Sequence, residues 1–330
     1  MEREYIGIDL HKAFFQACAL SQTGARLWET RVPRTPEGLT SFLPRLSAAT
    51  TVAVEACGPT WAFVDAITRT GAVPCVVDTR KTKLAAGYAA KTDRLDARRL
   101  ADAVRRGSVV SIYIPPPAIR AVREQCRSRQ QLVRLRTRVV QMVRALLLRT
   151  GAADAPMRQL YAPRGLAWLE HVEWAPEAAV SGPRLTHLLR VVQGEVAPAE
   201  GALRAAAAAD PIAQALDTLV GIGPVLGLTL RAEIGDITRF PRGPQLASYA
   251  GVVPRVHQSG GRSYGGHITK AGAPWVRWAL VEAARHALRR TDALGQWARH
   301  LQHQKGTAKA RVALARRLCD EIVRVWPRTV

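Results

Sequence analysis

Four carboxylate side chains in the first third of the chain are spaced so that they could bind divalent metal ions. Asp9 lies at the end of the apolar run YIGIDL, and Glu55 lies at the end of a second run, TVAVE. Asp93 and Asp96 are three residues apart in KTDRLDARRLADAVRRG, which predicts that they share one helix face. Clustered carboxylates bind hard cations, and two-metal phosphodiester chemistry needs ions held about 4 Å apart. These four residues are therefore the candidate site for hard divalent cations.

Each of these carboxylates, taken alone, also has a purely structural interpretation. Asp9 could end a strand, Glu55 could cap the next helix, and the other two could pair with neighbouring arginines. A carboxylate at the end of a buried strand is nevertheless costly unless a cation or hydrogen bonds meet it. The start YIGIDLHK also fits the phosphate loop of actin-like ATPases, but the further glycine-rich phosphate segments which that class requires do not occur before the basic helix at residues 119–150.

A second group with chemical potential is the basic, glycine-rich segment near residues 257–270. It offers hydroxyl groups beside cations and imidazoles, from His257, Ser259, Arg262, Ser263, His267, Thr269 and Lys270. A serine beside cations and a base could attack phosphorus, whereas a serine in a glycine loop is most often part of a turn. The residues alone do not decide between Ser259 and Ser263.

Two further segments suggest contacts with a phosphate backbone. In ALDTLVGIGPVLGLTLRAEIG, two short helices joined by Gly221 to Pro224 resemble a helix-hairpin-helix, whose free N–H groups bind phosphate; an ordinary helix turn is the alternative. Residues 119–150 predict one long helix in which nine arginines accompany a single acid, Glu124. Arg129 and Arg136 fall on the apolar seam of this helix, which is formed at heptad-like spacing by Ile119, Val122, Cys126, Val133, Val140, Val143 and Leu147. Predicted nucleic-acid contacts are Arg120, Arg127, Arg134, Arg138, Gly221, Gly223, Arg262 and Lys270.

The composition of the chain favours a polyanionic partner. The 330 residues contain 48 Lys and Arg against 26 Asp and Glu, a formal net charge of +22. Neither an apolar run long enough to span a bilayer nor a signal segment is evident, so we expect no membrane partner and a cytoplasmic protein. Five cysteines without close pairs support neither a disulfide framework nor a zinc site.

The elements that must position these residues predict an α/β fold followed by helices. Strand-like segments within residues 4–20, 51–58 and 72–79, with a helix near 60–70, indicate a hairpin and a β-α-β unit. We expect a domain at 1–150 ending in the long basic helix, a helical connection at 151–212, and a mainly helical domain at 213–330.

The ordered motifs YIGIDLHK, VAVEACG, KTDRLDARRLA, GIGPVLGLTLRAEIGD and LASYAGVVPRVHQSGGRSYGGHITKAG resemble those of insertion-sequence one-ten family transposases. The resemblance implies a RuvC-like (RNase H-fold) N-terminal domain, a coiled-coil region and a C-terminal transposase domain. It also implies that Asp9, Glu55, Asp93 and Asp96 bind Mg²⁺ and that Ser259 is the nucleophile. The cysteine and proline at 57 and 59 depart from the family pattern.

The activity implied by this resemblance is RNA-guided DNA recombination through a phosphoserine intermediate. The partners would be donor and target DNA, a bridge RNA encoded by the element, and further copies of the chain, as a dimer or tetramer. Two other functions stay open from the residues alone. One is a RuvC-like structure-specific endonuclease without a covalent intermediate, and the other is a non-catalytic nucleic-acid-binding scaffold.

Overall fold

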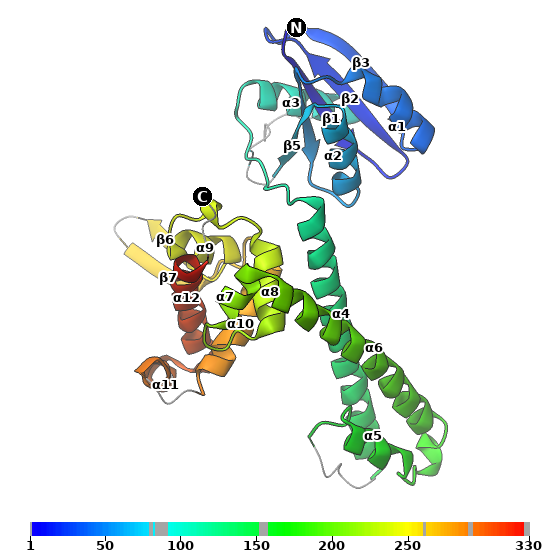
Figure 1. Ribbon diagram of the computed structural model, residues 1–330, viewed down its shortest axis with the longest axis vertical. Coiled ribbons are helices and arrows are strands. Elements are labelled where there is room, and N and C mark those ends of the chain that lie inside the picture. Colours follow the sequence, from blue (N-terminus) through cyan, green and yellow to red (C-terminus); the bar gives the residue numbers. More distant parts are fainter. Residues whose placement is uncertain are drawn as a thin grey trace. The chain divides into compact units, whose positions relative to one another are not determined.

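A computed structural model of the 330-residue chain describes residues 2–78, 82, 92–151, 158–259, 262–289 and 293–326, with backbone alone at 256–259 and 262–265. The chain forms two compact units, Met1–Ile114 and Pro115–Val330 (Figure 1). The long basic helix belongs to the second of these units. The three-domain division at residues 150 and 212 stays a prediction.

The first unit is built on a five-stranded mixed sheet in the order β3-β2-β1-β4-β5. Strands β1, β2 and β3 form an antiparallel meander, while β4 and β5 add in parallel to β1. The strands are β1 Glu4–Leu10, β2 Phe14–Leu20, β3 Arg26–Pro33, β4 Thr50–Glu55 and β5 Val73–Val77. The expected α/β class is confirmed, as are the predicted hairpin and the β-α-β unit.

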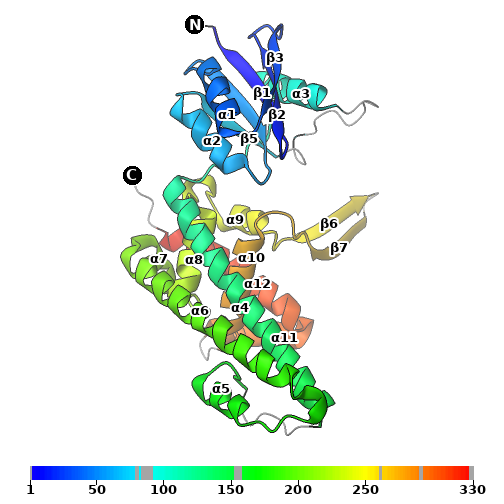
Figure 2. The ribbon, with the colours of Figure 1, turned by 90° about the vertical axis from the view of Figure 1, so that its right-hand side faces the viewer.

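Helices cover both faces of this sheet (Figure 2). Helix α1 (Pro36–Phe42), the 3₁₀ turn η1 (Leu43–Arg45) and α2 (Thr60–Arg69) lie on one face, where Phe42, Phe63 and Ile67 pack with alternate strand residues. Helix α3 (Asp93–Arg105) covers the other face. Because both faces are buried, the central strands are apolar almost throughout.

The second unit begins with the basic helix α4 (Pro117–Arg149), which is close to its predicted extent. It packs against α6 (Ser181–Ala209), and the contacts Arg129–Glu200 and Arg136–Gln193 show that the two helices run antiparallel. The short α5 (Pro163–Glu170) and the 3₁₀ turn η2 (Pro176–Ala178) lie between them in sequence. An apolar cluster including Val139, Leu160 and Leu189 joins α4, α5 and α6.

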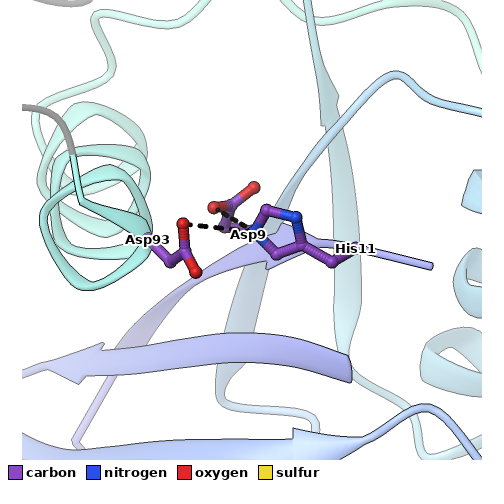
Figure 3. A group of neighbouring side chains, drawn as sticks. All are labelled: Asp9, His11 and Asp93. Atoms are coloured by element: carbon purple, nitrogen blue, oxygen red, sulfur yellow. Dashed lines mark hydrogen bonds and ion pairs between the residues drawn. The ribbon is translucent and has the colours of Figure 1, made fainter. Parts of the chain in front are cut away.

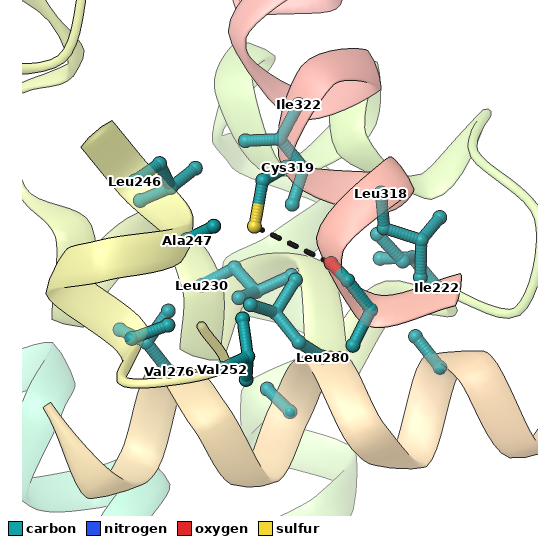
Figure 4. Packing of buried hydrophobic residues seen from close by; sticks show 14 of the residues in the cluster. Ile222, Leu230, Leu246, Ala247, Val252, Val276, Leu280, Leu318, Cys319 and Ile322 are labelled. Atoms are coloured by element: carbon teal, nitrogen blue, oxygen red, sulfur yellow. Dashed lines mark hydrogen bonds between the residues drawn. The ribbon is translucent and has the colours of Figure 1, made fainter. Parts of the chain in front are cut away.

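The remaining helices form the largest core of the chain. This core contains Leu230, Leu246, Leu280 and Cys319, all fully buried (Figure 4). The elements around it are α7 Pro211–Asp217, α8 Pro224–Ile234, η3 Ile237–Arg239, α9 Gly243–Ala250, α10 Pro274–Ala287, α11 Ala293–Lys305 and α12 Thr307–Val325. A hairpin of β6 (Pro254–Ser259) and β7 (Arg262–Ile268) is inserted between α9 and α10.

No helix in the described part combines the length and apolarity that crossing a membrane requires. All five cysteines are free, and Cys18, Cys126 and Cys319 are buried while Cys57 is exposed. Burial raises the pKa of the Cys319 thiol to about 12, so this cysteine behaves as a small apolar residue.

Candidate active site

The alternation of side chains along β1 directs Asp9 toward helix α3. Ile6 and Ile8 point into the cluster beneath α1 and α2. Successive side chains of a strand point to opposite faces, so Gly7 and Asp9 face the α3 side. Asp9 is next to last in the strand, where the sheet gives way to the turn before β2.

Gly7 allows α3 to approach the sheet closely. A Cβ atom at Gly7 would lie 2.0 Å from the Ala97 carbonyl oxygen and 2.4 Å from the Ala101 amide nitrogen, so only glycine fits. Thr92 caps the helix by accepting a hydrogen bond from the Leu95 amide at 3.3 Å. These contacts place the first turn of α3, and with it Asp93, above the end of β1.

Asp9, Asp93 and His11 meet at this point (Figure 3). His11 Nε2 lies 3.1 Å from Asp9 Oδ2 and 3.4 Å from Asp93 Oδ1. One potential ligand atom from each residue lies within 4.8 Å of the other two, which makes this the one metal-compatible group of His, Cys, Asp and Glu within the described ranges. The site is thus built from the end of β1, which supplies Asp9, the turn after it, which supplies His11, and the start of α3, which supplies Asp93.

The electrostatics of this group favour a cation. Burial raises the pKa of Asp9 above its ordinary value, and the charge and hydrogen bond of His11 partly offset that rise. The negative charges of Asp93 and Asp96 raise the pKa further. A metal ion would relieve both the burial cost and the repulsion between the carboxylates. Clustered carboxylate oxygens therefore fit the expected divalent ion.

Glu55 is in register with Asp9 on the neighbouring strand. Ile8 pairs with Val54 in the parallel β1–β4 ladder, so the next residues of both strands, Asp9 and Glu55, lie side by side at the strand ends. Ala53 packs on the α3 side of the sheet, and Glu55, two residues later, shares that side. The Thr60 hydroxyl lies 3.1 Å from the Glu55 carbonyl oxygen and helps fix the start of α2.

Asp96 lies one turn along α3 from Asp93, on the side predicted from the spacing. Its Oδ1 accepts a hydrogen bond from Arg99 Nη1 at 3.1 Å. The group of three potential ligands described above includes neither Asp96 nor Glu55. The roles of all four acidic residues in metal binding therefore stay predictions, although the fold brings all four to one end of the sheet.

His11 is the residue that the sequence analysis did not select for the site. The available signal was its position two residues after Asp9, just beyond the strand. Sequence periodicity does not predict where this side chain lies, because His11 belongs to a turn and the direction of the turn sets the position of the ring. Here the His11 amide donates to the Phe14 carbonyl at 2.9 Å, which turns the imidazole back toward the strand end.

The predicted serine loop forms the β6–β7 hairpin. In its backbone register Ser259 pairs with Arg262, and Gln258 pairs with Ser263. The side chains of Ser259, Arg262 and Ser263 lie outside the described residues. Lys270, just after the hairpin, is exposed and has a left-handed φ of 51°, with its amide donating to the Gly251 carbonyl at 3.1 Å.

The two glycines of the α7–α8 turn play different structural roles. Gly221 has φ 78°, and a Cβ there would lie 2.2 Å from the Ala283 carbonyl oxygen of α10, so this glycine is required for packing. Gly223 is the N-terminal cap of α8, and a Cβ on it would meet no atom within 4 Å. Open space at the start of a helix is compatible with an approaching phosphate.

The predicted basic contacts on α4 differ in their surroundings. Arg134 and Arg138 are exposed, and the Arg134 guanidinium lies 4.9 Å from the centre of the Trp275 ring. Arg127 instead forms a bidentate pair with Glu233, which is 3% exposed. Arg120 is partly buried. On α4, Arg134 and Arg138 are therefore the predicted residues best placed to meet phosphates.

The two arginines on the apolar seam have partners on α6. Arg129 bonds to Glu200 at 2.9 Å, and Arg136 bonds to Gln193 at 2.8 Å. The Arg136 guanidinium also lies 3.8 Å from the centre of the Tyr161 ring. These contacts explain how cations occupy an otherwise apolar interface: each charge meets a polar or aromatic group.

Comparison with known proteins places both units among transposases. Residues 213–314 match the Transposase IS116/IS110/IS902 family, and residues 6–151 match a transposase family of DEDD type named for IS110. The chain is 28% identical over 322 residues to the transposase for insertion sequence element IS1111A of Coxiella burnetii, covering 94% of this chain and 86% of that protein. It is also 28% identical over 294 residues to the transposase for element IS1328 of Yersinia enterocolitica, covering 87% and 84% of the two chains.

Proposed function

Because this chain is a DNA transposase of the IS116/IS110/IS902 family, we propose that it cuts and rejoins DNA under RNA guidance, using an acidic metal site and a serine nucleophile. The observation that carries the metal site is the convergence of Asp9 and Asp93 on His11 Nε2, at 3.1 and 3.4 Å. Residues 84 positions apart in sequence come together there because α3 docks on Gly7.

The acidic residues Asp9, Glu55, Asp93 and Asp96 would hold Mg²⁺ or Mn²⁺. When bound, the metal supplies Lewis acidity that stabilises negative charge on the phosphate and on the departing oxygen. The chain itself contributes the orientation: the parallel register aligns Asp9 with Glu55, and the capped start of α3 presents Asp93. The raised pKa of Asp9 supports the proposal, since clustered buried carboxylates are typical of metal sites.

The proposed nucleophile is Ser259, with Ser263 as the rival position. The Oγ atom would attack phosphorus, forming a serine phosphodiester as the bond to the departing DNA oxygen breaks. The proton lost by the serine is balanced by one taken up on the departing oxygen. Attack by a DNA hydroxyl on the phosphoserine then forms the new strand and releases the serine. The neighbouring Arg262 and Lys270 would neutralise phosphate charge.

Nucleic-acid binding follows from the basic charge of the chain. Arg134 and Arg138 on α4, with the open N-terminus of α8 at Gly223, would contact phosphates, whereas base pairing by an element-encoded bridge RNA would select donor and target DNA. Joining two duplexes requires them to be held together, so we propose a dimer or tetramer that acts in the cytoplasm at the nucleoid.

The experiment is a search for protein covalently attached to DNA. The chain, co-expressed with the DNA that flanks its gene, is incubated with plasmids carrying the excised junction and a target. The proposal expects a protein–DNA adduct in the parent and in Ser263→Ala, and none in Ser259→Ala or Asp9→Asn. An adduct that persists in Ser259→Ala but disappears in Ser263→Ala would transfer the role to Ser263. Cleavage without any adduct would establish a structure-specific nuclease instead.

A further inference from the structure

We propose that His11 is itself a ligand of the metal ion held by Asp9 and Asp93, and that its nitrogen shifts the preference of the site from Mg²⁺ toward first-row transition ions such as Mn²⁺. The inference rests on the proposed metal site. It goes further by assigning a fifth side chain and a metal class. His11 lies outside the four acidic residues predicted from the sequence.

The separations between the three side chains fit coordination of one ion. Ligand atoms about 2.1 Å from a six-coordinate ion lie roughly 3 Å apart when adjacent and roughly 4.2 Å apart when opposite. His11 Nε2 is 3.1 Å from Asp9 Oδ2 and 3.4 Å from Asp93 Oδ1. Small side-chain rotations would therefore place all three atoms around a single ion, with Nε2 presenting its lone pair in the neutral imidazole.

The imidazole is held in place by its own turn. The His11 amide donates to the Phe14 carbonyl, and the His11 and Phe14 rings lie 4.7 Å apart, tilted by 31°. The Arg31 guanidinium covers the Phe14 ring at 3.6 Å from its centre. This stack limits the positions that the His11 ring can adopt. A preorganised ligand loses less conformational entropy when the ion binds.

Whether a ligand atom is oxygen or nitrogen decides which metal ions bind more tightly. Mg²⁺ prefers oxygen ligands and retains its water, whereas imidazole nitrogen suits transition ions better. A set of oxygen donors alone would not discriminate strongly in favour of Mn²⁺. Adding one nitrogen therefore raises the affinity for Mn²⁺ relative to Mg²⁺. A competing role is purely positional, in which a protonated Nε2 donates hydrogen bonds that hold the two carboxylates.

The test measures metal binding by the full chain. Calorimetric titration with Mn²⁺ and with Mg²⁺ is performed on the parent, His11→Ala and His11→Gln, with pulsed EPR of bound Mn²⁺ to detect a coordinated nitrogen. Glutamine can donate a hydrogen bond to the carboxylates but offers no imidazole. His187→Ala, which removes an exposed histidine on α6, is the matched control.

The expected result is a nitrogen coupling in the parent and in His187→Ala that is absent from both His11 variants. Their Mn²⁺ affinity should fall by at least about tenfold while Mg²⁺ affinity changes much less. Equal losses for both ions, with rescue by glutamine, would overturn ligation in favour of positioning. Mn²⁺ binding in the parent without nitrogen coupling would also overturn it. Failure of the proposed function is distinct: the parent would bind neither ion more tightly than Asp9→Asn does.

Discussion

The Arg127 guanidinium forms two parallel hydrogen bonds with the Glu233 carboxylate, at 2.7 and 2.9 Å. The Glu233 side chain is 4% exposed, so these hydrogen bonds satisfy a carboxylate that has little access to water. Arg123 lies beside the pair and donates to the carbonyl oxygens of Ala232 and Glu233. Arg123 and Arg127 therefore hold helix α4 against the end of α8, and Arg127 is also one of the predicted nucleic-acid contacts.

Replacing Arg127 should destabilise the second unit. Arg127→Ala leaves a buried carboxylate without its bidentate partner, which we expect to lower the free energy of unfolding by about 2–3 kcal/mol. Urea unfolding followed by circular dichroism measures this change. Arg138→Ala, at an exposed position of the same helix, is the control and should change stability by less than about 0.5 kcal/mol. Equal effects from the two variants would contradict the structural role.

Arg138 should instead affect nucleic-acid binding. If its guanidinium meets one phosphate, Arg138→Gln weakens binding to DNA and reduces the slope of log K against log salt by about 0.9. Fluorescence anisotropy with a labelled duplex over a series of salt concentrations gives both quantities. An unchanged slope in a correctly folded variant would remove Arg138 from the interface.

Gly7 should be intolerant of any side chain. In Gly7→Ala the Cβ would collide with the backbone of α3, so we expect a loss of about 3 kcal/mol or more, together with weaker metal binding as Asp93 moves. Thermal unfolding and Mn²⁺ titration measure the two effects. Gly58→Ala is the matched control in the same unit, since a Cβ at Gly58 meets nothing within 4 Å. A Gly7→Ala variant as stable as this control would disprove the close docking of α3.

The local parts of this fold were predictable from the sequence. Buried strands leave apolar runs and an amphipathic helix leaves a periodic pattern, and these patterns predicted that Asp9 and Glu55 end strands and that Asp93 and Asp96 share one helix face. The contacts between distant segments were not predictable. Nothing near Arg129 or Arg136 indicates their partners on α6, and nothing near Gly221 shows that α10 covers it. His11 was missed for the same reason, because a turn rather than a periodic element brings its ring to the site.

Acid should weaken the α4–α6 helix pair at Glu200. Burial raises the pKa of this carboxyl, but hydrogen bonds with Arg129 and Arg204 outweigh that effect and lower the pKa below its ordinary value of 4.5. A lowered carboxyl pKa adds stability that is fully present above pH 4.5 and is lost as the pH falls through the folded-state value. Since the pair is partly exposed, the contribution is at most about 1 kcal/mol.

The measurement for Glu200 compares urea unfolding of the parent and Glu200→Gln at pH 7 and at pH 3. The variant should be less stable than the parent at pH 7, and the difference should shrink at pH 3. Glu195→Gln, at an exposed position on the same helix, is the control. A difference that does not change with pH would show that the ion pairs of Glu200 add no stability.

The ionisation of Asp9 should lower the stability of the metal-free chain, in contrast to that of Glu200, and a bound metal ion should remove this cost. Burial, opposed in part by His11, raises the pKa of Asp9, so the folded state holds its proton more tightly than the unfolded state does. The resulting stability is present below the ordinary value of 3.8 and is lost as the pH rises through the folded-state pKa. At neutral pH the ionised carboxylate therefore costs stability in the metal-free chain.

Asp9→Asn removes that charge and should raise the melting temperature without metal, whereas added Mn²⁺ should stabilise the parent and leave the variant unchanged. Melting curves of both proteins in EDTA and in Mn²⁺ decide the matter: an asparagine variant less stable than the parent in EDTA would show that the Asp9 charge is already satisfied by His11 without a metal ion.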